Sequence, residues 1–226
     1  NIDATNTLVI KSVYGGNDVS GTIGVSSENL PITPQATEIT KEWNALVRVT
    51  KNTTHPVIIG TLYGGGNGDY EYDDENKKPI LRKTYIELNG GIYGSIYGGG
   101  NNATVTDRTV IYTALNGTLD QISKVYEGYA SLLGLAEGDD YTINGDNMVF
   151  NYHANRVLGG NNLATMGIRP TWHLQNAKIN NLYSGGNRGA MTSPNGLLLT
   201  LQSDGLSVNN VYGGCRMADV NPRMMN

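Results

Sequence analysis

A short motif, in which an aliphatic residue and a tyrosine precede two or three glycines, recurs six times and constrains the fold more than any other feature. The copies read IKSVYGGND, IGTLYGGGN, YGSIYGGGNNA, ANRVLGGNNLA, INNLYSGGNRGA and VNNVYGGCRMA. Aligned on the aromatic position, they bring into register Tyr14, Tyr63, Tyr97, Leu158, Tyr183 and Tyr212. Internal similarity of this kind is typical of stacked repeat architectures.

Two further positions of the motif keep their chemical character. The residue before the aromatic position is aliphatic in every copy: Val13, Leu62, Ile96, Val157, Leu182 and Val211. The residue four places after it is polar: Asp18, Asn67, Asn101, Asn162, Asn187 and Arg216. We expect the aliphatic residues to form one interior column, with near-complete burial in the four inner copies. Stacked asparagines are expected to hydrogen-bond from one repeat to the next.

The spacing of the motif predicts the architecture. The aromatic positions lie 49, 34, 61, 25 and 29 residues apart, and the last two values set a minimal coil of 25–29 residues. Such a coil holds three short strands and three turns. We therefore predict an all-β, right-handed parallel β-helix (β-solenoid) with three strands per coil, forming a single domain over residues 1–226. The glycines after the aromatic position are predicted to adopt positive φ in the turns.

Three insertions explain the longer spacings. They span residues 19–45, which contain Pro31 and Pro34, residues 68–79, which are acidic and aromatic, and residues 113–147. Within the third insertion, apolar residues recur at steps of three and four and predict a helix over residues 118–134 that covers the solenoid wall. A partner-binding helix is the alternative. The face expected to pack comprises Leu119, Ile122, Tyr126, Tyr129 and Leu133.

Composition argues against several classes of function. The net charge is −4 and the basic residues are scattered, so nucleic-acid binding is not expected. No apolar run approaches the roughly 18 residues needed to cross a bilayer, so no transmembrane segment is predicted.

The chain begins at Asn1 without a methionine or signal sequence, and the first motif starts at Ile10. We therefore expect a fragment of a longer protein, with neighbouring coils or domains at its ends.

The motif VYGGGN, preceded by strands of the form x-Ile-x-Leu-Asn-Gly-Gly-x-Ile, resembles the parallel β-helix proteins that gut and oral bacteria of the Bacteroidetes group secrete or display. The resemblance runs from about Leu8 to Val220 outside the insertions, and it departs from the pattern at Leu158, Ser184 and Cys215–Arg216. It implies an extracellular or outer-surface location. It also implies kinship with adhesins and polysaccharide-handling proteins.

One acidic run is a candidate metal site. If residues 69–75 were extended, alternation would point four carboxylates to one side. Oxygen ligands of this kind suit Ca²⁺, the one cofactor that the sequence leaves open. A solvated acidic loop is the alternative. The four candidate ligands are Asp69, Glu71, Asp73 and Glu75.

The tyrosines of the motif are the candidate binding residues. If the aliphatic position faces the core, alternation turns the neighbouring ring outward, and a column of rings offers a platform for sugars. The alternative is that the rings serve as packing. The column would comprise Tyr14, Tyr63, Tyr97, Tyr183 and Tyr212.

Two functions follow from these patterns. The first is a noncatalytic surface or secreted module that binds a glycan, binds a host or bacterial surface protein, or acts as a spacer. The second is a polysaccharide-degrading β-helix enzyme, or an inactive relative of one, which would need charged side chains from adjacent coils to converge in one groove. No nucleophile motif or zinc-binding pattern is present in the sequence, so the first function is favoured.

Overall fold

The computed structural model describes residues 8–23, 45–50, 57–115, 121–131, 133–201 and 205–220. Its regular structure is almost entirely β, and the helices within these residues are two short 3-10 helices, η1 at Glu75–Lys77 and η2 at Lys124–Tyr129. The all-β class with parallel sheets is therefore confirmed.

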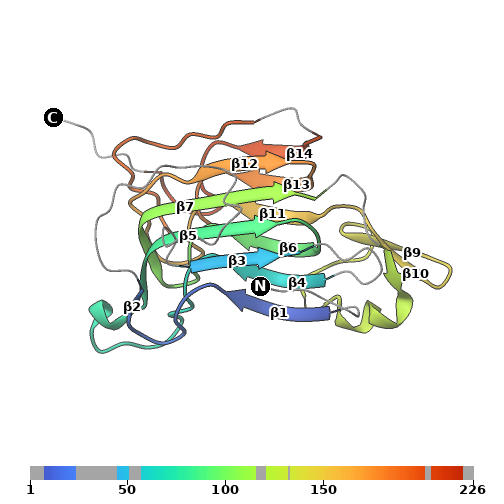
Figure 1. Cartoon of the computed structure of the whole chain (residues 1–226), viewed down its shortest axis with the longest axis horizontal. Coiled ribbons are helices and arrows are strands. Elements are labelled where there is room, and N and C mark those ends of the chain that lie inside the picture. Colours follow the sequence, from blue (N-terminus) through green and yellow to red (C-terminus); the bar gives the residue numbers. More distant parts are fainter. Residues whose placement is uncertain are drawn as a thin grey trace.

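The first sheet contains all six copies of the motif. Its strand order is β1-β4-β6-β11-β13-β14, and every neighbouring pair is parallel, as Figure 1 shows from β1 at one end to β14 at the other. The pairing aligns the motif position by position, so aliphatic residues pair with aliphatic ones and aromatic positions with aromatic ones. The bounds are β1 Leu8–Tyr14, β4 Val57–Tyr63, β6 Ile92–Tyr97, β11 Ala154–Leu158, β13 Lys178–Tyr183 and β14 Ser207–Tyr212.

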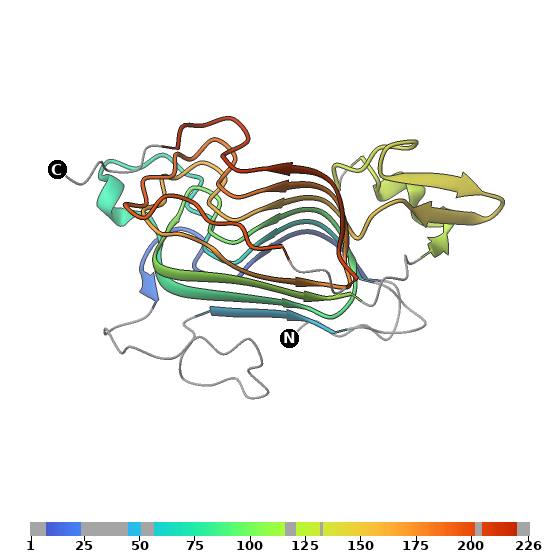
Figure 2. The ribbon, with the colours of Figure 1, turned by 90° about the horizontal axis from the view of Figure 1, so that it is seen from above.

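A second parallel sheet lies opposite the first, with the order β12-β7-β5-β2 and with β3 also paired to β5. Along the chain, strands of the two sheets alternate, from β4 to β5, from β6 to β7 and from β11 to β12. Figure 2 shows the two layers facing each other. The bounds are β2 Thr22–Ile23, β3 Ala45–Val49, β5 Ile80–Leu88, β7 Thr104–Ala114 and β12 Thr171–Gln175.

The main core lies between the two sheets. The aliphatic position of the motif points into it, and the four inner residues, Leu62, Ile96, Val157 and Leu182, are each 0% exposed. They meet residues such as Ile86 and Leu174 from the second sheet. The predicted interior column is therefore confirmed for these inner copies. At the two edges Val13 is half-buried and Val211 is 46% exposed, because each edge strand has a strand neighbour on one side only within the described parts of the chain.

The glycines of the motif serve close packing, and the predicted positive φ is wrong for them. Positive φ occurs at Gly21 and Gly68 but at none of the glycines that directly follow the aromatic position, all of which are described. A Cβ added at Gly64 would come within 2.4 Å of the Gly98 carbonyl oxygen, and one at Gly98 equally close to that of Gly159. The next repeat therefore leaves no room for a side chain there.

A third side joins the two sheets only weakly. At one end β2 pairs with Ile80–Leu81, the start of β5, while the later repeats have isolated bridges that link Met166 to Met191 and Met191 to Val220. Within the described residues this side therefore has short pairings and isolated bridges in place of long strands, and three strands per coil stays a prediction. Pro170 and Pro194 follow these bridges and lack the backbone N–H that a longer ladder needs.

The helix predicted within residues 113–147 is wrong. Strand β7 continues to Ala114, and the described residues beyond it form an antiparallel sheet of order β8-β10-β9 together with η2. Tyr129, expected on the packed face, is exposed. Figure 2 shows this small sheet projecting at one end of the two main layers. Its strands are β8 Gln121–Ser123, β9 Tyr141–Asn144 and β10 Asn147–Phe150.

This insertion covers part of the outer face of the first sheet, as expected, although with strands and turns. Ile122, Leu133 and Phe150 pack with Ile58 and Ile92 of β4 and β6 in a second apolar cluster. The backbone of Leu133 lies so close to Gly60 and Gly94 that a Cβ on either would contact it. The apolar residues at steps of three and four therefore lie in a turn and a short strand, not in a helix. The strand forms because β8 pairs with β10, which is distant in the sequence.

The remaining insertions differ in how far the structure describes them. Most of 19–45, with Pro31 and Pro34, lies outside the described residues. Residues 68–79 form a loop that contains η1. Within the described parts of the chain, no helix has the length and apolar character needed to cross a membrane.

Candidate functional site

The tyrosines of the motif form a ladder on the face of the first sheet opposite the main core. Their rings stack on one another with centroids 4.9 Å apart for Tyr14 and Tyr63, 4.9 Å for Tyr63 and Tyr97, and 4.6 Å for Tyr183 and Tyr212. Leu158 fills the gap between the two stacked groups. The register therefore follows the sequence, and the rings lie on the side expected from alternation.

The prediction that this column offers ring faces to a sugar is wrong for the inner tyrosines. Tyr63 and Tyr97 are only 7% exposed. The ring of Tyr63 lies between the rings of Tyr14 and Tyr97, and the ring of Tyr97 lies between Tyr63 and Leu158. Burial also raises the pKa of both phenols. Free ring surface remains mainly at the ends, where Tyr14 is 36% and Tyr212 is 43% exposed. The column thus contributes mainly packing.

A second ladder connects the polar position of the motif across all six strands. Each asparagine donates from Nδ2 to Oδ1 of the preceding copy: Asn101 to Asn67 at 2.8 Å, Asn162 to Asn101 at 2.7 Å and Asn187 to Asn162 at 2.7 Å. At one end Asn67 donates to Asp18 at 2.8 Å. At the other, Arg216 donates to Asn187 at 3.1 Å. The predicted bonding between stacked asparagines is confirmed, and it runs head to tail in one direction.

The two ends of this amide ladder carry opposite charge. Asp18, which can only accept, ends it at the β1 side, and Arg216, which can only donate, ends it at the β14 side. Hydrogen bonds from Asn67 and from the Tyr70 hydroxyl hold the pKa of Asp18 below its usual value. Arg216, which departs from the motif in the sequence, thus supplies the donor that ends the ladder on one side, and Asp18 supplies the acceptor on the other.

Charged groups near the tyrosine ladder also differ along its length. Partial burial raises the pKa of Tyr14, and the carboxylates of Asp18 and Asp69 raise it further. Burial likewise raises the pKa of Tyr97, but there the guanidinium groups of Arg156, Arg216 and Arg188 oppose the rise. The charges that act on the tyrosine ladder are therefore carboxylates at Tyr14 and guanidinium groups at Tyr97.

Two additional polar rows lie on the last three strands, and sequence reasoning missed them. Asn180 donates to Asn155 at 3.0 Å, and Asn210 donates to Asn181 at 3.2 Å. The signal was present, since the last three copies begin ANR, INN and VNN at matching positions. This part of the sheet offers amide groups together with the exposed Tyr212.

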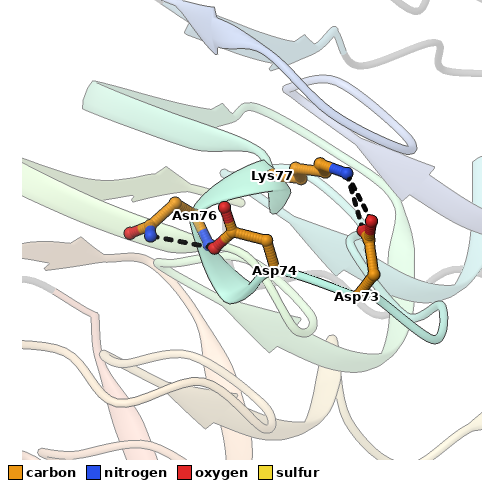
Figure 3. Close-up of polar contacts among 4 residues, drawn as sticks. All are labelled: Asp73, Asp74, Asn76 and Lys77. Atoms are coloured by element: carbon orange, nitrogen blue, oxygen red, sulfur yellow. Dashed lines mark hydrogen bonds and ion pairs between the residues drawn. The ribbon is translucent and has the colours of Figure 1, made fainter.

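The acidic run does not form the extended strand on which the calcium prediction depended. Asp73 instead pairs with Lys77 at 2.7 Å, and Asp74 caps η1 by accepting from the backbone N–H of Asn76, as Figure 3 shows. Glu75 pairs with Lys78 at 2.6 Å. The tyrosines between the acids anchor the loop to the preceding repeat, since Tyr70 donates to Asp18.

The four candidate calcium ligands are therefore not brought together. Among the described residues, no group of three or more acidic, histidine or cysteine side chains is placed to hold a metal ion. The candidates were Asp69, Glu71, Asp73 and Glu75.

Among the described residues, acidic and basic groups from adjacent strands meet at two places outside the ladders. At the first, Arg48 of β3 pairs with Glu87 of β5 at 2.8 Å, and the second lies around Asp107. Asp107 of β7 lies 3.7 Å from Arg82 and 3.8 Å from Lys83 of β5. It also lines a shallow hollow with Arg108 and Arg169. This arrangement has a single carboxylate, whereas most glycoside hydrolases use a pair flanking the bond that is cleaved.

Comparisons with protein-family models, curated proteins and solved structures found no match to this chain. The resemblance to Bacteroidetes β-helix proteins therefore remains an expectation from the repeat motif.

Proposed function

We propose that the two parallel sheets wind as a right-handed β-solenoid and that the chain is a rigid, noncatalytic module of a secreted or surface-displayed bacterial protein. The observation that carries this proposal is the continuity of the ladders: aliphatic, aromatic and amide positions each run through all six motif strands. In stacked arrays each repeat is stabilised by its neighbours, and the array forms a stiff extended body.

The use of charged side chains favours this module over a polysaccharide-degrading enzyme. Asp18 and Arg216 complete the amide ladder, and Asp73 and Glu75 form ion pairs within their own loop. These groups thus have structural partners. The bacterial surface location is supported by the motif resemblance alone.

Stiffness can be measured between the two ends of the stack. Spin labels at Lys11→Cys and Asn209→Cys, in a Cys215→Ser background, would sit at the same motif position on β1 and β14. Five interstrand steps of about 4.8 Å predict one narrow distance distribution centred at roughly 24 Å, widened by the label linkers. A broad or multimodal distribution in double electron–electron resonance would contradict a rigid stack.

Glycan recognition by the outer face of β11, β13 and β14 is the second candidate function. The observation that favours it is the pair of amide rows next to the exposed Tyr212. Amides bond to sugar hydroxyls, and a tyrosine ring has an apolar face on which a sugar can stack. Such a surface would also suit a host or bacterial surface protein that carries glycans.

A glycan array tests whether this face binds glycans. The double variant Asn181→Ala with Asn210→Ala, and separately Tyr212→Ala, should each lose the binding that wild type shows. Asn195→Ala, an exposed residue in a loop outside this face, is the control and should bind normally. Absence of wild-type binding removes the glycan candidate, and release of oligosaccharide fragments by wild type would instead establish an enzyme.

A further inference from the structure

The two edges of the six-stranded sheet carry the same motif, and in the part of the chain that the structure describes no strand pairs with their outer sides. Strand β1 pairs only with β4, and β14 pairs only with β13, among the described residues. Both edges expose apolar side chains, including Leu8 and Tyr14 at one and Val211 and Tyr212 at the other. An edge of this kind is a template for pairing with another strand.

The chemistry of the two edges is complementary. Tyr14 stacks on Tyr63 with one face and Tyr212 stacks on Tyr183 with one face, so each edge has one free ring face. The amide ladder ends in a carboxylate at the β1 edge and a guanidinium at the β14 edge. Both terminal side chains are exposed, and both have bonding capacity beyond the contacts they make within the chain.

From this complementarity we propose that the β14 edge binds the β1 edge of a second copy of this chain, in the same orientation, and continues the parallel sheet. The register already used by all five internal pairs would place Val211 against Val13 and Tyr212 against Tyr14 of the second copy. It would also place Arg216 against Asp18 of that copy. The arginine would then donate to the amide oxygen of Asn187 on one side and to the Asp18 carboxylate of the second copy on the other.

Other pairings of two copies fit less well. A twofold arrangement of β14 against β14 would run the strands antiparallel and would bring two Arg216 side chains together. The β1 edges would likewise bring together two Asp18 carboxylates. Because the favoured contact joins different surfaces, it does not close on itself and adds copies in a row.

The proposal depends on the complementary edges of the sheet and not on the spacer role, so either proposal can fail alone. Sedimentation velocity of the full chain over a concentration series up to about 1 mM covers even weak protein association. Wild type should form dimers and longer species as concentration rises. A wild type that stays monomeric throughout overturns the proposal.

Charge variants identify the contact. Arg216→Glu and Asp18→Lys, each alone, should weaken association at least tenfold, because each places like charges across the junction. The double variant should restore association to within a few fold, because the junction again pairs opposite charges. Association of the single variants at the wild-type level, or of the double variant no better than the singles, contradicts the assignment.

Two further variants separate loss of contact from loss of fold. Arg188→Glu makes the same change of charge at an exposed arginine of the preceding repeat, away from the edge, and should associate as wild type. Val211→Lys places a charge on the exposed edge and should abolish association while circular dichroism and melting temperature stay near wild type. Association that survives Val211→Lys would overturn the edge as the interface.

Discussion

The inner and outer repeats of the first sheet have the same motif but different environments. In β6 and β11 the aliphatic residues Ile96 and Val157 are fully buried, whereas Val211 of β14 is almost half exposed. The ring of Tyr97 is covered and the ring of Tyr212 is free on one side. Burial in this fold is therefore supplied mainly by the adjacent repeat, so the same substitution should have a large effect in the centre and a small effect at the ends.

Removing the aliphatic side chain should give the largest contrast. Ile96→Ala leaves a cavity between two fully packed sheets and should lower the free energy of unfolding by about 4 kcal/mol. Val211→Ala, at the same position of the end repeat, should cost about 1 kcal/mol or less because much of that side chain already contacts solvent. Urea unfolding followed by circular dichroism measures both. Equal losses would contradict the dependence on neighbours.

A methyl group at the first glycine of the motif should give the next largest contrast. Gly98→Ala drives its Cβ into the carbonyl oxygen of Gly159 and should destabilise by about 2–3 kcal/mol through forced separation of two strands. Gly213→Ala at the same position of β14 meets no atom within 4 Å and should lie within about 0.5 kcal/mol of wild type. Neither glycine has positive φ, so a backbone preference for glycine predicts no difference between the two variants. Thermal melts in which only Gly98→Ala is destabilised would therefore identify packing as the cause.

Removing an asparagine from the middle of the amide ladder should lower the free energy of unfolding more than removing the side chain at its end. Asn101→Ala removes an acceptor from Asn162 and a donor to Asn67, and it should destabilise by about 2 kcal/mol because both bonds are part-buried. Arg216→Ala removes one exposed bond and should change stability by about 0.5 kcal/mol or less. Chemical denaturation tests the pair, and a larger loss for Arg216→Ala would show that the ladder does not act as inferred.

The smallest expected difference is between the two ends of the ladder as pH falls. The pKa of Asp18 is lowered in the folded state, first by the bond from Asn67, so its contribution to stability is present above its ordinary pKa. That contribution is lost as pH falls through the lowered pKa, whereas Arg216 remains charged throughout. Asp18→Asn should therefore reduce the acid sensitivity of the melting temperature below about pH 4. An unchanged acid profile would mean that Asp18 does not titrate in this range as inferred.

Features that depend on neighbouring copies of the motif could be predicted from the sequence. The interior column, the aromatic register and the bonds between asparagines all follow from aligning equal positions, because parallel stacking repeats each environment. The pairing of Val157 with Ile96 and of Leu182 with Val157 needs no knowledge beyond that alignment.

Features that depend on contacts outside the motif could not be predicted in the same way. The spacing of Ile122 and Leu133 fits a helix, but the long-range pairing of β8 with β10 and the packing onto Ile58 make a strand and turn more favourable. The acidic run fits a strand, but Lys77 and Lys78 form ion pairs with its carboxylates. The ring of Tyr97 fits an outward platform, but its neighbours cover it.

A matched series of backbone amides tests the central comparison most directly. The amide after the aromatic position donates to the carbonyl of the next repeat in five copies, from Gly15 to Tyr63 at 3.0 Å through to Ser184 to Tyr212 at 2.9 Å. Hydrogen exchange of these five amides, measured by NMR on dilute protein, should be slowest at Gly98 and fastest at Gly15 and Ser184. Protection that is equal along the series, or highest at its ends, would contradict stabilisation by neighbouring repeats.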